Sequence, residues 1–379
     1  MAFSLQNLLG SLFKPKSLSV IGLDIGASSI KLTQLRLARG AAVLETYGEI
    51  ALGPYAKMPI GKAVKLPPEK LAEAVQDLMR EANVTARTAG ISIPFSSSLI
   101  TILNLPKVDK EQLKQIVPIE ARKYIPMAVS EVVMDWFVIP KDESAQGEFD
   151  RVNAQDPIRA KGEEVLLVAI HNTILQSYQT LASACSITAE FYEIEIFSAI
   201  RSSVGHGLAP VLFVDIGAAT TKMYVVERGV VRFTHLVTVG SQQMTETLGR
   251  SLGWDFEKAE RVKRERGLVN ASAYSVEEND RIREALLSTL TRVFSEVNRV
   301  LLNYGQRYNK NIAHVVFSGG GASLPGLAEV ASKALSAEVE IANPFNRTET
   351  PAFMASVLSE IGPGFTVSIG LALRALKHE

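Results

Sequence analysis

One eight-residue motif occurs twice in this chain, and its residue types are those that bind phosphate and divalent cations. The first copy, Asp24-Ile25-Gly26-Ala27-Ser28-Ser29-Ile30-Lys31, recurs in the second half of the chain as Asp215-Ile216-Gly217-Ala218-Ala219-Thr220-Thr221-Lys222. Each copy follows an apolar run and leads into alternating apolar and polar residues, which predicts a second strand and not a helix. We therefore expect a β-hairpin with a small, polar tip in each half, and a two-lobed, pseudo-symmetric molecule.

The two tips carry three kinds of group that suit a magnesium–phosphate ligand. Gly26 and Gly217 let the backbone approach an anion because no Cβ stands in the way. Short side chains complete each tip, namely Ala27, Ser28 and Ser29 in the first copy and Ala218, Thr220 and Thr221 in the second. Lys31 and Lys222 either reach a phosphate or point to solvent. Asp24 and Asp215 repel phosphate, so we expect them to hold Mg²⁺ through water.

A third glycine cluster, Gly319-Gly320-Gly321, lies between an apolar run at 313–317 and a segment with helical spacing at 326–337. Three glycines between a strand and a helix let the backbone touch a flat ligand, and a helix N-terminus favours an anion. We interpret the cluster as the nucleoside side of a nucleotide cleft.

Composition excludes several classes of protein. Lysine plus arginine and aspartate plus glutamate are both 40, and no basic block occurs, so nucleic-acid binding is not expected. The single cysteine, Cys185, cannot form an intrachain disulfide and indicates a reducing compartment. Uninterrupted apolar runs such as Val165–Ile170 fall short of the roughly 20 residues of a membrane span. Met1–Lys16 is either a short amphipathic helix or a frayed terminus.

The motifs together resemble the nucleotide-binding superfamily of actin, Hsp70 and the sugar kinases, including a closing helix at Ser368–Arg374. More narrowly, roughly residues 15–379 resemble PilM, the family of actin-like type IV pilus assembly proteins. The specific segments are Ile116–Pro126 and Glu131–Asp135, which in that family mark a small inserted subdomain shared with FtsA. The resemblance implies an α/β, two-lobed actin-like ATPase fold with duplicated phosphate-binding hairpins and an FtsA-like insertion.

The same resemblance assigns further residues and implies the cofactors ATP and Mg²⁺. The segment Asp255–Lys263 resembles the helix that approaches the nucleoside, which places Glu260 and Lys263 at the ribose or base. Glu195 falls where bacterial actins have the Glu that positions the attacking water, although Ile196 replaces their proline and Glu193 is close by. ATPase activity is expected to be slow at most.

Pattern and resemblance together divide the chain. The expected parts are an N-terminal tail (1–16), a first-lobe core (17–87 and 183–208), an inserted subdomain (88–182) with a strand at 90–94 and a polar hairpin tip at 141–163, a second-lobe core (209–240 and 313–379), and a second-lobe insertion (241–312) with a helix at 277–308. The apolar stripe of that helix is expected to be core.

By the resemblance, the chain is a cytoplasmic assembly protein whose inserted subdomain binds the N-terminal peptide of a PilN-like inner-membrane protein. PilO and the pilus motor ATPases are implied as indirect partners, contact with the membrane as mainly borrowed from the partner, and self-association as an open option. A small-molecule kinase of the same superfold and an FtsA-like membrane filament are the alternatives. The kinase needs a catalytic Asp in a substrate cleft, and FtsA-like chains continue beyond the closing helix into a linker and an amphipathic helix. An Hsp70 function is least expected.

Overall fold

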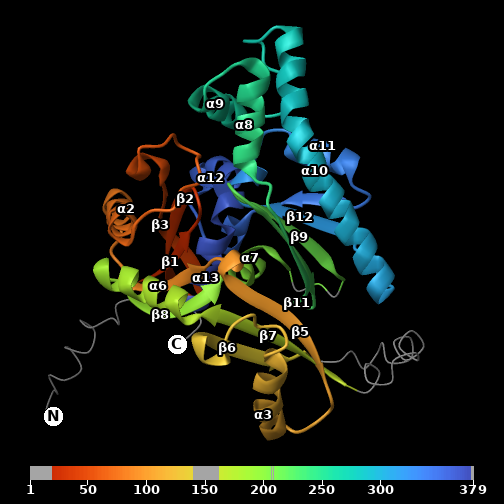
Figure 1. Ribbon diagram of the computed structural model, residues 1–379. Coiled ribbons are helices and arrows are strands. Elements are labelled where there is room, and N and C mark those ends of the chain that lie inside the picture. The colour runs from red at the N-terminus through yellow and green to blue at the C-terminus, as the bar shows by residue number, and fades with distance from the viewer. Residues whose placement is uncertain (1–18, 140–161, 206, 208, 377–379) are drawn as a thin grey trace, which may run out of the picture.

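The structure is a computed structural model that describes residues 19–139, 162–205, 207 and 209–376. The expected N-terminal helix and most of the expected polar hairpin tip lie outside these residues. Two five-stranded sheets lie side by side, and a three-stranded sheet lies at one end of the molecule (Figure 1).

The first sheet has the spatial order β3-β2-β1-β4-β8. Its strands are β1 (Ser19–Ile25), β2 (Ser29–Ala38), β3 (Ala41–Ala51), β4 (Thr88–Ile93) and β8 (Thr188–Ile194). Successive residues of β1 point to opposite faces of the sheet and so meet different partners. Ile21 and Leu23 pack on α2 (Pro68–Glu81) and α6 (Asn172–Ala184), whereas Val20 packs on α13 (Thr366–Ala375). Asp24 follows Val20 by four residues in the same strand, so its side chain lies on the same face of the sheet. That face is covered by α13 and is directed toward the middle of the molecule.

The second sheet repeats this plan in the order β11-β10-β9-β12-β13, so the expected pseudo-symmetry and both expected hairpins are confirmed. Its strands are β9 (Val211–Ile216), β10 (Thr221–Glu227), β11 (Val230–Val237), β12 (His314–Ser318) and β13 (Glu338–Ile341). In both sheets an antiparallel three-strand meander is followed by two parallel strands. The remaining helices of this lobe are α8 (Ser241–Leu252), α9 (Phe256–Glu265), α10 (Val276–Tyr308), α11 (Leu327–Ala334) and α12 (Ala355–Ile361).

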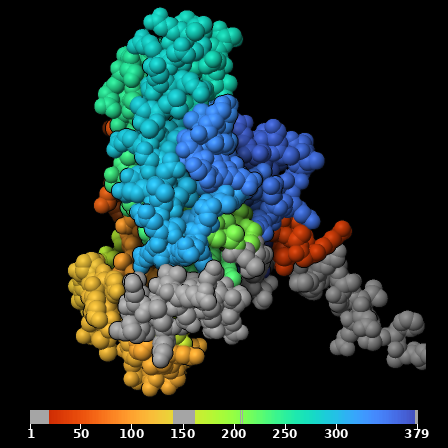
Figure 2. All heavy atoms as spheres, turned by 90° about the vertical axis from the view of Figure 1, so that its right-hand side faces the viewer, coloured from red at the N-terminus to blue at the C-terminus, as the bar shows by residue number. Residues whose placement is uncertain are grey.

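Helix α10 confirms the expected long helix. Ser275 begins it with a reciprocal capping box to Glu278, which satisfies two backbone donors at the N-terminus. Its apolar stripe, including Ile282, Leu290 and Val297, is buried in the second-lobe core. The helices α8 and α9, with the first turns of α10, project at one end of the molecule, and the three-stranded sheet lies at the other (Figures 1 and 2).

The inserted sheet has the order β5-β7-β6, with α3 (Lys110–Ala121) packed on one face. Its strands are β5 (Ser98–Leu105), β6 (Val132–Val138) and β7 (Glu163–His171). The strand expected at 90–94 as part of the insertion is β4, which pairs in parallel with β1 and β8 in the first sheet. Likewise α6 packs its buried Leu181 and Ala182 into the first-lobe core. No change in composition marks these junctions, because a buried parallel strand and an insertion strand have the same apolar pattern.

Short 3₁₀ segments connect the regular elements. They are η1 (Gly53–Ala56), η2 (Phe95–Ser97), η3 (Val129–Glu131), η5 (Gly320–Ser323), η6 (Pro344–Arg347), η7 (Ala352–Met354) and η8 (Gly362–Phe365). Helix α7 (Glu195–Ser203) follows β8 directly and packs against α13.

The segment Ala352–Ala375, which ends in α13, is long and apolar enough to span a membrane. Its most apolar stretch of 18 residues has a mean hydropathy of 1.3, but 61% of that stretch is buried inside the fold. Charged and polar residues such as Glu360 and Thr366 interrupt this segment, so no single uninterrupted apolar run marks it in the sequence. Two glycines let α13 approach its neighbours closely. A Cβ on Gly22 of β1 would lie 1.7 Å from the Ser368 carbonyl oxygen, and one on Gly370 would lie 1.9 Å from the Ser198 carbonyl oxygen. The burial and these contacts identify α13 as a core helix that packs between β1 and α7.

Candidate functional site

The two hairpin tips close in the same way. The Gly26 N–H donates to the Ser29 carbonyl at 3.0 Å, and the Gly217 N–H donates to the Thr220 carbonyl at 2.9 Å. A Cβ on Gly26 would lie 2.9 Å from the Ser29 oxygen, and one on Gly217 would lie 3.0 Å from the Thr220 oxygen. The glycine N–H groups are thus used within the turns. An anion at the tips would instead meet the backbone of the residues that follow, Ala27 and Ala218.

Asp24 lies at the end of β1 beside a hydroxyl that the sequence argument missed. Ser92 of β4 donates its Oγ to Asp24 Oδ1 at 2.9 Å and accepts the Ile25 N–H at 3.1 Å. Burial, together with the nearby Glu195 carboxylate, raises the pKa of Asp24 to about 6. The available signal was a single hydroxyl between Ile91 and Ile93, in a run from Ala89 that is otherwise apolar and buried.

The two repeat lysines occupy equivalent positions but have different partners. Lys31 lies opposite Asp24 in the β1–β2 register, and Lys222 lies opposite Asp215 in the β9–β10 register. Neither side chain points to solvent, because both are at most 14% exposed. Lys31 Nζ contacts Glu49 Oε1 at 3.0 Å and Ser29 Oγ at 2.8 Å.

Lys222 Nζ contacts Asp215 Oδ2 at 2.9 Å and Glu195 Oε2 at 2.6 Å. The third strand of each meander explains the difference. In the first lobe β3 places Glu49 opposite Lys31, whereas in the second lobe β11 places Leu236 opposite Lys222. Lys222 therefore turns to the carboxylates of the cleft. Burial opposes its charge, but Asp215 and Glu195 together hold the pKa of Lys222 above its usual range.

Glu195 is the first residue of α7, where a carboxylate interacts favourably with the helix dipole. Its Oε1 accepts the Phe95 N–H at 2.7 Å and its Oε2 accepts Lys222. The neighbouring Glu193 has a different role, because it pairs with Arg201 at 2.7 Å and with Arg374 between β8, α7 and α13. Burial opposes its charge, but these arginines lower the pKa of Glu193 below its usual range. Of the two, Glu195 is the carboxylate that contacts Lys222 of the second hairpin.

The third glycine cluster lies against the second hairpin. Gly319 has a φ of +82°, and a Cβ there would lie 2.2 Å from Asp215 Oδ1. A Cβ on Gly321 would lie 2.4 Å from the Ile216 side chain, whereas nothing lies within 4 Å of one on Gly320. Gly364 of η8 connects this cluster to the first lobe, since a Cβ there would lie 3.0 Å from Lys31 Cε and 3.9 Å from Gly320 Cα. Gly320 is therefore the open position.

Glu260 and Lys263, assigned by resemblance to the nucleoside, form a buried pair on α9. Lys263 Nζ contacts Glu260 Oε2 at 2.7 Å, Thr245 Oγ1 at 2.9 Å and the Ser241 carbonyl at 3.2 Å. Both side chains are less than a tenth exposed. Burial lowers the pKa of Lys263 despite the carboxylate beside it. Glu260 and Lys263 thus contact each other and residues of α8 in this structure.

A loop of the first lobe, residues Met58–Leu66, crosses to this pair, and we name it the strap. Gly61 has a φ of +90°, and a Cβ there would lie 2.6 Å from the Glu260 carboxylate. Lys62 Nζ contacts Glu246 Oε1 at 2.8 Å, and the Ala63 N–H donates to Gln242 Oε1 at 2.7 Å. The Val64 N–H donates to the Ala27 carbonyl at 2.9 Å. The strap therefore connects the first hairpin tip to α8 and α9.

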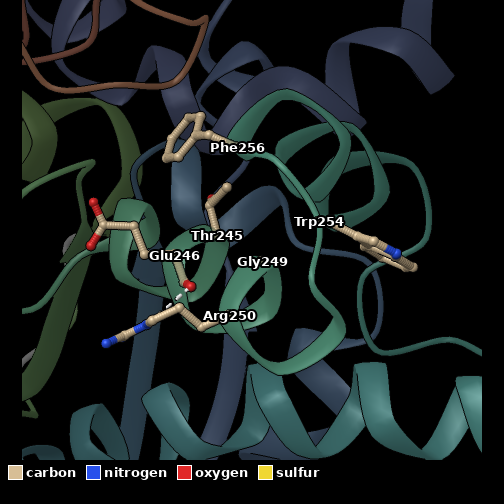
Figure 3. A pocket seen from close by; sticks show the side chains of 6 residues that line it. All are labelled: Thr245, Glu246, Gly249, Arg250, Trp254 and Phe256. Atoms are coloured by element: carbon tan, nitrogen blue, oxygen red, sulfur yellow. Dashed lines mark hydrogen bonds between the residues drawn. The ribbon is translucent and has the colours of Figure 1, made fainter.

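A hollow of about 310 Å³ lies between α8 and α9, next to the strap (Figure 3). Its lining residues are Thr245, Glu246, Gly249, Arg250, Trp254 and Phe256. Lys62 reaches its rim, since Nζ lies 4.8 Å from the centroid of the Phe256 ring. Thr245 joins it to the buried pair by donating to Glu260 Oε2 at 2.5 Å.

The acidic residues next to the two hairpin tips are Asp24 and Asp215. Within the residues that the structure describes, no three side chains of His, Cys, Asp or Glu are grouped so as to hold a metal ion. Asp24 and Asp215 each end the first strand of a hairpin, and both influence the same lysine, since Lys222 contacts Asp215 and lowers the pKa of Asp24. The Lys222 ammonium group thus contacts two carboxylates, Asp215 and Glu195, and acts electrostatically on a third, Asp24.

Comparisons with known proteins agree with this architecture. The family described as type IV pilus assembly protein PilM matches residues 22–376. A solved PilM–PilN type IV pilus biogenesis complex is 22% identical, with 94% of this chain and 98% of that chain covered and a TM-score of 0.75. MreB5 of Spiroplasma citri bound to ADP is 10% identical, with 96% and 97% covered and a TM-score of 0.53.

Curated relatives are cell division proteins. FtsA of Neisseria meningitidis serogroup B is 24% identical over 339 residues, which are 82% of this chain and 79% of that protein. FtsA of Agrobacterium fabrum is 22% identical over 246 residues, 58% of this chain, and the match spans about half of that protein, 54%. The family match covers nearly the whole chain, and the two hairpins, the pseudo-symmetric sheets and the inserted subdomain are those of an actin-like fold. The chain therefore belongs to the PilM family of type IV pilus assembly proteins.

Proposed function

We propose that this chain is an ATP-binding component of a pilus assembly platform, which links nucleotide binding in the cleft to capture of a membrane-protein peptide by the inserted subdomain. One observation carries the nucleotide half of the proposal. Two hairpin tips with identical closing hydrogen bonds face a glycine cluster whose middle residue, Gly320, has open space where a side chain would stand. Flat ligands that touch backbone require such a surface.

The residues present fit a magnesium–nucleotide ligand. A Cβ on Gly319 would collide with Asp215 Oδ1, so this carboxylate borders the glycine surface. Asp24 and Asp215 would hold Mg²⁺ through water, and Lys31 would meet phosphate oxygens close to Gly320. When bound, Mg²⁺ would neutralise phosphate charge, which its preference for oxygen ligands and retained waters allows. Asp24, with its raised pKa, gains most from a nearby cation.

The inserted subdomain has an edge that suits an extended peptide. β6 is an outer strand of its sheet. Its side chains alternate, with Met134 and Trp136 packed toward the subdomain core and Val133 and Phe137 exposed at 48% and 43%. An outer strand with exposed apolar side chains can accept another strand and bind its alternate side chains. We propose the N-terminal peptide of a PilN-like inner-membrane protein as the occupant, supported by the similarity to a PilM–PilN complex.

On this proposal the protein is cytoplasmic and reaches the inner membrane through its partner. PilO and the motor ATPases would be linked to it indirectly.

Titration calorimetry with Mg·ATP tests the nucleotide half. Asp24→Ala and Asp215→Ala should each weaken Mg²⁺-dependent affinity at least tenfold, about 1.4 kcal/mol. Asp280→Ala, which changes an exposed aspartate of α10, is the control and should bind as the parent does. Unchanged affinity in both cleft variants would refute the nucleotide site.

Fluorescence anisotropy with a labelled PilN-like N-terminal peptide tests the partner half. Phe137→Asp should weaken peptide binding at least tenfold because it places a charge in an apolar contact. The control is Leu302→Asp, which adds the same charge at a site on α10 that is 66% exposed. Equal binding by the parent and Phe137→Asp would exclude β6 as the docking edge.

A further inference from the structure

Both carboxylate oxygens of Glu195 already accept a hydrogen bond from the protein. Its Oε1 accepts the Phe95 N–H at 2.7 Å, and its Oε2 accepts Lys222 Nζ at 2.6 Å. A general base must be within hydrogen-bond reach of the proton that it takes. In this arrangement both oxygens of the candidate base are already occupied by protein donors.

Lys222 is built into this position by its surroundings. It comes from β10 of the second lobe and contacts Glu195 at the start of α7 in the first lobe. Its strand neighbour on β11 is Leu236, so that strand offers no carboxylate. The exposed fractions of the Lys222, Glu195 and Asp215 side chains are 14%, 12% and 8%. At such burial the contacts are little weakened by solvent.

We propose that Lys222 is a positioning residue that suppresses ATP hydrolysis, by holding Glu195 in an ion pair across the base of the cleft. This inference rests on the proposed function and adds its regulation. In hydrolysis, the oxygen of a water molecule bonds to the γ-phosphorus and the bond from that phosphorus to the β,γ-bridging oxygen breaks. The water proton passes to the base, and ADP and phosphate leave. With Lys222 on Glu195 Oε2, the ammonium group competes with that water for the carboxylate, so transfer of the proton is slowed.

The repeat supplies a comparison within the molecule. Lys31 occupies the equivalent place in the first hairpin, yet it is held by Glu49 on β3 and Ser29. It leaves Asp24 to Ser92 and does not block a carboxylate of the cleft. Only one of the two equivalent lysines therefore connects the two lobes through an acid of the site.

The test is single-turnover hydrolysis at saturating Mg·ATP, together with ATP affinity and thermal unfolding of the nucleotide-free protein. Lys222→Met should raise the turnover rate about tenfold or more, because the Glu195 carboxylate becomes available. Lys222→Arg retains the positive charge at Glu195, so it should not show this rise in turnover. The double variant Lys222→Met/Glu195→Gln should lose the gain, since the gain acts through Glu195. Lys222→Gln, a second neutral variant, replaces Lys222→Met if that protein does not fold.

Nucleotide-free protein gives an independent measurement. Lys222→Met should lower the unfolding temperature, and adding Glu195→Gln should recover part of the loss, because the two side chains are coupled. The control Lys310→Met removes a different ion pair, the one between Lys310 and Glu227 of β10. It should leave turnover unchanged. Normal ATP affinity with no rise in turnover, or a rise that survives Glu195→Gln, would overturn this inference and leave the proposed function standing. Absence of ATP binding in the parent protein would overturn both.

Discussion

Replacing Asp24 with Asn should stabilise the nucleotide-free protein and abolish its use of Mg·ATP. The amide retains an oxygen that can accept the Ser92 hydroxyl, which now lies 2.9 Å from Asp24 Oδ1. It removes the charge that burial and Glu195 make unfavourable. The site would thus gain stability by losing the group proposed to hold the cation, as stability–function trade-offs predict.

The magnitude follows from the pKa of Asp24, which is raised from 3.8 to about 6 in the folded protein. One pKa unit is worth about 1.4 kcal/mol, so the ionised carboxylate costs the folded protein about 3 kcal/mol. Below pH 3.8 the group is protonated in both the folded and the unfolded chain, and the penalty is absent. The penalty grows as the pH rises toward 6, because the unfolded chain ionises first, and it is complete above that value.

Urea denaturation of the parent and Asp24→Asn from pH 4 to pH 8 measures this difference. The variant should have the higher free energy of unfolding at pH 8, by up to about 3 kcal/mol, and the difference should shrink toward pH 4. Asp215→Asn is the matched control with the opposite sign, since it removes a partner of Lys222 and should cost about 3 kcal/mol. An Asp24→Asn protein that is no more stable than the parent at pH 8, or whose advantage does not depend on pH, would refute the reasoning.

Four further predictions address the glycine surface, the strap and recruitment. Gly320→Val should keep the free energy of unfolding within about 0.5 kcal/mol while weakening ATP affinity at least tenfold by calorimetry. Gly319→Ala should instead destabilise the fold by about 2 kcal/mol, because its φ is +82° and its Cβ would meet Asp215. The double variant Lys62→Ala/Gln242→Ala should speed release of a fluorescent ATP analogue about tenfold in stopped flow, with a stability loss of only about 1 kcal/mol. An unchanged release rate would exclude a role of the strap in retaining the nucleotide. Flotation with liposomes should require the PilN-like partner and should survive deletion of Met1–Phe13, whereas flotation without any partner that is lost on this deletion would favour a self-anchored, FtsA-like protein.

The repeat made the fold predictable. Asp-Ile-Gly-Ala followed by alternation determines a hairpin locally, and finding it twice gave the two-lobed plan. The same pattern located both aspartates and both lysines at the tips. It could not indicate the partners of those lysines, because Glu49 and Leu236 become their neighbours only through the strand register. Ser92 and the strap contacts were missed for the same reason, since they join residues far apart in the chain.

A duplicated motif therefore does not imply duplicated chemistry. The first hairpin has an acidic third strand, so its lysine is neutralised locally and its aspartate stays largely uncompensated. The second hairpin has Leu236 at the equivalent position of its third strand, so its lysine turns to Asp215 and Glu195. The first hairpin is thus prepared to receive a cation at Asp24, whereas in the second hairpin Asp215 already contacts the Lys222 ammonium group. Binding without rapid turnover is the behaviour expected of such a site, and it suits a protein whose proposed work is assembly.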